Sequence, residues 1–322
     1  AAGHARMTAQ AMRQGVSRLA RIPGVAIVLA LLSVGFSLAN PNFATPGNIA
    51  NLLVQSTLLT LLALPTTVVI MTEGLDLSIG AVLTLASIAL ALTVVATGSA
   101  ALGILAGLAV GLGFGLLNGV LVASLNLPPF IATLGTLGIA QGLSLVVTDG
   151  QSVVGIPSSI ERIYSGTLLG IPVPILLAAA AYGVVHVLLY RTRFGVAVFA
   201  LGGNREALRL AGVSDRAMLV AVYALSGLIA GFAALLMTAR LNAAHPTAGL
   251  GLEFDAIAAV AVGGTSFERG NGWLFGSLLG VIAVGVLRNG LNLAAVPSST
   301  QVACIGALVI VALFIAALRS RA

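Results

Sequence analysis

Long apolar runs, separated by short polar connectors, constrain the fold of this chain more than any other feature. Hydrophobic residues make up 59% of the sequence and charged residues only 7%, whereas a soluble domain is typically about half apolar and roughly a quarter charged. So few charged side chains cannot cover a soluble globule, and lipid must be the solvent for most of the surface. The mean hydropathy of +1.11 agrees with this. We therefore predict an all-α polytopic membrane protein.

The apolar runs predict about ten transmembrane helices. A span needs about 20 mostly apolar residues, and the polar and helix-breaking residues are concentrated in the connectors. The eighth run is short and rich in Ala and Gly, so we expect a short or broken span there. The expected spans cover residues 23–39, 49–72, 77–97, 100–123, 130–148, 170–190, 217–238, 250–264, 272–292 and 300–318.

Arginine positions predict the orientation of these spans. Cytoplasmic connectors carry an excess of basic residues, and with both ends in the cytoplasm all arginines except Arg162, Arg240 and Arg288 fall on that side. No cleavable apolar segment precedes residue 23, so the first span is expected to be retained. The expected organisation is a basic cytoplasmic segment (1–22), a single transmembrane domain (23–318) with a cytoplasmic loop at about 191–216, and a cytoplasmic tail (319–322).

Several classes of function are excluded by what the sequence lacks. Lysine is absent, and a Walker A loop needs a lysine that reaches the β- and γ-phosphates, so the chain carries no P-loop ATP site. The single Cys304 excludes intramolecular disulfides and Cys-rich metal sites. Neither a GxSxG nor an HExxH motif occurs, so Ser226 and His186 do not indicate a protease. No catalytic residue, metal or cofactor is expected.

Neutral polar residues inside the spans have two interpretations. They either form hydrogen bonds between helices or line an aqueous path for a polyhydroxylated solute. Asn118 and Gln141 are the strongest candidates for such a path, because small neighbours leave room beside them. The polar residues in question are Gln55, Asn118, Gln141, Asn289 and Asn292.

Glycines recur every four residues in the fourth span. Such a row of small residues lets two helix backbones approach closely. Packing within the helix bundle is the expected role, with a contact between subunits as the alternative. The row consists of Gly103, Gly107, Gly111, Gly115 and Gly119.

The stretch EGLDLSIG, residues 73–80, places two carboxylates between long apolar runs. An ion-coupled transporter would hold such acids near the middle of a span. The nine acids of this chain instead fall in connectors or near span ends, so the coupling energy is expected to come from elsewhere. We expect Gly74 to break the chain, Asp76 to cap the third span and Ser78 to lie in its first turn.

The long loop ALGGNREALRLAGVSD contains the signals of one short helix. Asn204 is a favourable N-cap, Glu206 and Arg209 complement the helix dipole, and Gly212 ends the helix. Ser214 is expected to cap the following span. A helix of about seven residues is too short to persist alone in water. It therefore needs a partner surface, which is either another part of the chain or another cytoplasmic subunit.

Taken together, these stretches resemble the inner-membrane permease subunits of sugar ABC importers, of the ribose-type branch. The matching segments are EGLDLSIGAVLTLAS, ALGGNREALRLAGV, ARLNAAHPTAGLGLEFDAIAAVAVGGTSF, GNG and RNGLNL, in the family's order between about residues 49 and 318. The GGTSFERGNG turn departs from the family's pattern at Phe267, Glu268 and Arg269, so no role is carried over to it.

The resemblance implies a function and a set of partners. The expected function is the permease subunit of an ATP-binding-cassette importer that moves a monosaccharide, a pentose or hexose, from periplasm to cytoplasm across the bacterial inner membrane. The implied partners are a cytoplasmic ATPase, a periplasmic sugar-binding protein and a second copy of the chain, without nucleic acid. An ATP-independent secondary carrier or facilitator is the alternative. The residues implied to couple to the ATPase are Gly203, Asn204, Arg205, Glu206, Arg209 and Gly212.

Overall fold

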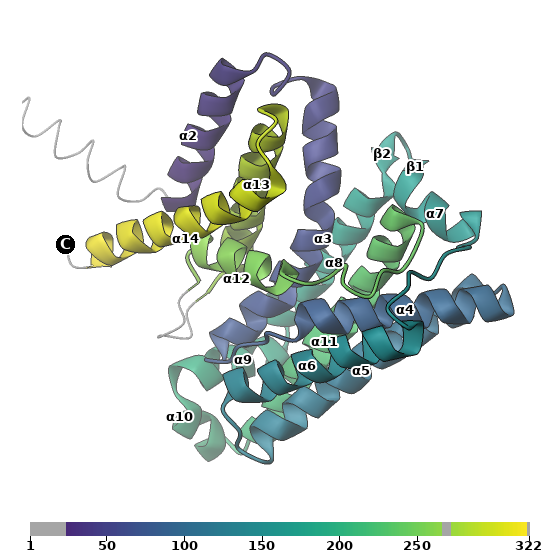
Figure 1. Ribbon diagram of the computed structural model, residues 1–322. Helices are drawn as coiled ribbons and strands as arrows, with labels where there is room; N and C mark the ends of the chain where they lie inside the picture. Colours follow the sequence, from purple (N-terminus) through teal and green to yellow (C-terminus); the bar gives the residue numbers. More distant parts are fainter. Residues whose placement is uncertain (1–23, 266–271, 321–322) are drawn as a thin grey trace, which may run out of the picture.

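The computed structural model describes residues 24–265 and 272–320, which are predominantly helical (Figure 1). The predicted N-terminal segment 1–22, the end of the tail, and Phe267, Glu268 and Arg269 lie outside these residues. A hairpin of β1 (Thr167–Leu168) and β2 (Ile171–Pro172) interrupts the helices. The helices are α2 (Gly24–Ala39), α3 (Pro46–Met71), α4 (Ile79–Thr97), α5 (Ala100–Ala123), α6 (Pro129–Thr148), α7 (Ser158–Ser165), α8 (Val173–Arg191), α9 (Arg193–Gly203), α10 (Arg205–Leu210), α11 (Asp215–Leu241), α12 (Leu252–Val262), α13 (Leu274–Leu293) and α14 (Ser298–Ser320).

Each predicted span coincides with a helix, but the helices differ in length. Within the described part of the chain, seven have the length and hydropathy of a membrane span: α3, α4, α5, α6, α8, α11 and α13. Helix α2 and residues 298–311 of α14 are shorter apolar helices. Helix α12 has only 11 residues, as the short eighth run predicted. The prediction of a helical, polytopic membrane protein is thus confirmed.

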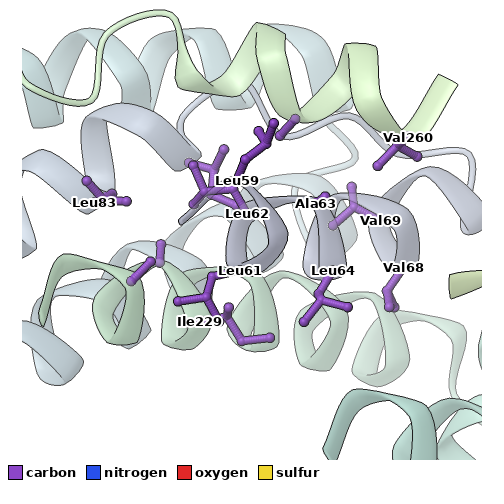
Figure 2. Close-up of a cluster of buried hydrophobic side chains, with 14 of the residues drawn as sticks. Leu59, Leu61, Leu62, Ala63, Leu64, Val68, Val69, Leu83, Ile229 and Val260 are labelled. Atoms are coloured by element: carbon purple, nitrogen blue, oxygen red, sulfur yellow. The ribbon is translucent and has the colours of Figure 1, made fainter. Parts of the chain in front are cut away.

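Helix α3 is the centre of the molecule. Every residue from Ser56 to Met71 is buried, and the helix packs against α8, α11, α12 and α13. Figure 2 shows its leucine and valine side chains among Leu83 of α4, Ile229 of α11 and Val260 of α12. Because lipid tails are as apolar as leucine, close packing rather than exclusion of water holds such a helix in a membrane.

Helices α5 and α11 are in backbone contact along a seam of glycines. Gly111 and Gly115 of α5 face Gly227 and Gly231 of α11. A Cβ atom on Gly231 would lie 2.7 Å from the carbonyl oxygen of Gly107, closer than real Cβ atoms approach. The prediction that this glycine row packs within the helix bundle is therefore confirmed.

Helices α7 and α9 and the β1–β2 hairpin lie in stretches predicted as connectors. Helix α9 is apolar and buries Val198 and Leu201, but its 11 residues are too few for a span. The sixth span begins at Val173 instead of residue 170. It is shorter because Leu169 and Gly170, both with positive φ, form the turn of the hairpin.

Candidate functional site

The turn between α3 and α4 is tied to three other helices by buried hydrogen bonds. Asp76 is 3% exposed. Its Oδ1 accepts from the backbone N–H (3.0 Å) and the hydroxyl (2.7 Å) of Ser78, and its Oδ2 accepts from Ser226 Oγ of α11 (2.7 Å). Asn118 of α5 donates from Nδ2 to Ser78 Oγ (2.8 Å), and Thr136 of α6 donates to Asn118 Oδ1 (2.6 Å). This set of five residues, the Asp76 network, joins the turn to α5, α6 and α11.

The backbone of the same turn is also fixed. The carbonyl oxygen of Leu75 accepts from the hydroxyls of Thr133 (3.2 Å) and Tyr223 (3.4 Å). A Cβ atom on Gly74 would lie 2.8 Å from Tyr223 Oη and 3.0 Å from Val69 Cγ1. A side chain at position 74 would have to displace the Tyr223 hydroxyl from this position.

Glu73 and Asp76 lie in different environments and have different roles. Glu73 is exposed, whereas Asp76 is buried. Helix α4 begins at Ile79 with Ser78 at the N-cap position, so the prediction that Asp76 caps this helix is wrong. Asp76 instead closes the preceding turn by accepting the Ser78 N–H. Burial raises the pKa of the Asp76 carboxyl, and the hydrogen bonds from Ser78 and Ser226 oppose the rise.

Asn118 and Gln141, predicted to line a solute path, both form hydrogen bonds inside the protein. Asn118 is 1% exposed, and both ends of its amide are bonded in the Asp76 network. Gln141 Nε2 of α6 donates to the carbonyl oxygen of Pro246 (2.9 Å), between α11 and α12. Its Oε1 is buried without a hydrogen-bond partner in the described part of the chain. For Asn118 these contacts favour the other interpretation, hydrogen bonding between helices.

Helix α10 begins and ends where its sequence predicts. Asn204 Oδ1 accepts from the N–H of Ala207 (2.9 Å), which makes Asn204 the N-cap. Gly212 has φ +76°, and the N–H of Val213 donates to the carbonyl oxygen of Leu208 (3.2 Å). This closure is typical of a helix terminated by glycine. Gly203 is the last residue of α9, so Asn204 alone separates α9 from α10.

Ion pairs hold α10 against the beginning of α11. Asp215 Oδ2 accepts from Arg205 Nε (2.8 Å) and from Arg209 Nη2 (2.6 Å). The Asp215 side chain is 9% exposed, whereas that of Arg209 is 60% exposed. The hydrogen bond and charge of Asp215 raise the pKa of Arg209. Both arginines predicted to couple to another subunit are therefore engaged by an aspartate of the same chain, while Glu206 is exposed.

Comparison with known proteins places these features in a family. Residues 48–313 match the family described as "Branched-chain amino acid transport system / permease component". The chain belongs to this permease family. The matched region includes the Asp76 network and α10, and the ribose-type resemblance predicted from the sequence motifs is confirmed.

Relatives of this permease cover nearly its whole length. The ribose import permease protein RbsC of Bacillus subtilis is 40% identical over 289 residues, 89% of this chain and 90% of the relative. The D-allose transport system permease protein AlsC of Escherichia coli is 36% identical over 291 residues, 90% of this chain and 89% of the relative. The L-arabinose ABC transporter permease protein AraH of Azospirillum brasilense is 32% identical over 300 residues, 93% and 88% of the two chains. No solved structure matches the permease.

Proposed function

We propose that this permease is the transmembrane subunit of an ATP-binding-cassette importer that carries a monosaccharide, a pentose or hexose, into the cytoplasm. The observation that carries the proposal is the set of relatives named for ribose, allose and arabinose, each aligned over most of its length. The seven helices of spanning length supply a membrane domain for such a path.

The energy is proposed to come from a separate cytoplasmic ATPase. The chain has no lysine with which to build a Walker A loop, so it is proposed to transport without hydrolysing ATP itself. A periplasmic sugar-binding protein is proposed to deliver the solute. Two copies of the permease are proposed to enclose the path between them, as the resemblance implies.

Helix α10 is proposed to be the element that docks to the ATPase. Leu210 at its end is 84% exposed, and Glu206 and Arg209 of the same helix are exposed as well, so this side of α10 is open to a partner. Asp215 fixes this short helix against α11 through Arg205 and Arg209. The fixed orientation supports a role in which movement of a partner is passed into the membrane domain.

The decisive experiment reconstitutes the permease in proteoliposomes with its cognate ATPase and binding protein. We expect ATP-dependent uptake of at least one of labelled ribose, allose and arabinose, and none of labelled leucine. Permease alone is expected to be silent. Leucine uptake without sugar uptake would show that the proposed substrate is wrong. The substrate would then be a branched-chain amino acid, which the family description names.

A secondary carrier is the second candidate, and one buried acid favours it. Glu253 of α12 is buried, and its Oε2 has no hydrogen-bond partner in the described part of the chain. A proton-coupled carrier would use such a carboxylate. In that case the lone permease would take up sugar along a proton gradient, and Glu253→Gln would abolish the uptake. Uptake of this kind would overturn the importer proposal.

A further inference from the structure

A polar cavity lies between α3, α11, α13 and α14. Its volume is about 340 Å³, within the range of about 300–1,000 Å³ that is usual for small-molecule sites. Asp215 lies at the beginning of α11 and Arg240 near its end. The length of helix between them places the cavity roughly 37 Å from the α10 ion pairs. In the proposed orientation this is the periplasmic side. The polar lining includes Gln55, Arg240, Arg288, Asn292 and Gln301.

Some amide groups of the cavity lining form hydrogen bonds within the protein, and others keep a donor or acceptor that a solute could use. Gln301 Nε2 donates to Asn292 Oδ1 (2.7 Å) and to the carbonyl oxygen of Val296 (2.9 Å). This leaves Gln301 Oε1 as an acceptor and Asn292 Nδ2 as a donor. The side chain of Gln55, which lies on α3, makes no hydrogen bond to a residue that the structure describes. Polar groups within a membrane domain are costly unless they are bonded, so this arrangement suits a solute that both donates and accepts.

The lining contains two arginines, and one of them is paired with an acid of the protein. Arg288 Nη2 donates to Asp255 Oδ2 (2.6 Å), which compensates its charge. Arg240 lines this cavity and also a second one of about 440 Å³ beside His245 and Thr247. Arg240 is therefore part of the lining of both cavities. Guanidinium and amide groups offer several donors and acceptors at fixed positions, which matches the hydroxyls of a sugar.

We propose that this cavity is a site at which the permease itself binds the transported monosaccharide on its way in, with Gln55 and Arg240 contacting sugar hydroxyls. The inference rests on the proposed function and adds a sugar-binding step within the membrane subunit. It also moves the expected path residues from Asn118 and Gln141 to side chains of α3 and α11.

The test compares two variants with matched controls in the full reconstituted transporter. Gln55→Leu and Arg240→Gln each remove one side chain that is exposed and forms no ion pair within residues 24–265 and 272–320. We expect each to lower sugar uptake about 3- to 10-fold, the effect of losing about one hydrogen bond. The controls Gln151→Leu and Arg162→Gln change exposed residues outside the cavity and should stay within about twofold of wild type.

Two further measurements separate a binding defect from a folding or coupling defect. Thermal unfolding and basal ATPase activity should be the same in the variants and the controls. In a Cys304→Ala background, maleimide should label Gln55→Cys, and saturating ribose, allose or arabinose, whichever is transported, should slow the labelling. Uptake equal to the controls, or labelling unaffected by sugar, would overturn the site. Failure of the wild-type transporter to take up any sugar would instead overturn the proposed function.

Discussion

At the scale of single residues, the α5–α11 seam shows how strongly two positions on one helix can differ. A Cβ atom on Gly111 would lie 2.8 Å from the backbone nitrogen and Cα of Gly231. Gly113, two residues further along α5, has open space where its Cβ would be. Backbone atoms cannot rotate out of the way, so only the first position requires glycine.

We therefore expect Gly111→Ala to destabilise the permease by about 1–3 kcal/mol, the usual cost of overpacking. Gly113→Ala should be neutral or slightly stabilising, because alanine is the better helix former. Thermal unfolding of the two variants in the same detergent measures the difference. Equal melting temperatures would contradict the close contact of α5 and α11.

Local signals predicted some of the site residues, and tertiary contacts determined the rest. The caps at Asn204 and Ser214 follow from bonds that span three residues, so the sequence alone predicts them. The Ser226–Asp76 bond joins residues 150 positions apart, and nothing in the sequence brings these two together. The cavity residues Gln55 and Gln301 also come from distant helices. Gln55 was visible only as an isolated polar residue, and Gln301 was not among the candidates.

At the scale of elements, α10 depends on α11 for its orientation. Six residues are too few for a stable isolated helix. Asp215 supplies the missing contacts by binding Arg205 and Arg209. Helix α9 illustrates the opposite case, because its apolar sequence has the composition of a span but only 11 residues, which is why the sequence alone did not reveal it as a helix.

Reversing the charge in Arg209→Asp should reduce sugar-stimulated ATPase activity several-fold by releasing α10 from α11. Insertion should be unchanged and thermal stability should fall only modestly, because Asp215 keeps Arg205 as an ion-pair partner. Adding Arg205→Asp and Asp215→Arg exchanges the charges on both sides of the two ion pairs and should recover much of the coupling. Glu206→Lys, at an exposed position of α10, is the control for a charge change on this helix that leaves the ion pairs intact. If the triple variant stays uncoupled, the arginines contact the ATPase directly.

At the scale of the whole molecule, the proposed ten-span topology requires both ends to lie in the cytoplasm. The arginine distribution supports this, and α2, α12 and α14 would have to complete the crossings made by the seven longer helices. Green fluorescent protein fused to either terminus should fluoresce in bacterial cells. Alkaline phosphatase inserted at Gly150, after α6, should be active. A phosphatase-active C-terminal fusion would show that the number of crossings is odd.

The glycine seam also determines how the molecule can deform. Helix α11 has 27 residues, a length of about 40 Å, and it carries Asp215 at one end and Arg240 at the other. Its contact with α5 is backbone against backbone, so no side-chain rotation can absorb a push applied at α10. The two helices must therefore tilt together as one rigid unit. A tilt of about 5° would displace the far end by about 3.5 Å, which exceeds the length of a hydrogen bond and is enough to bring Arg240 into or out of reach of a sugar hydroxyl.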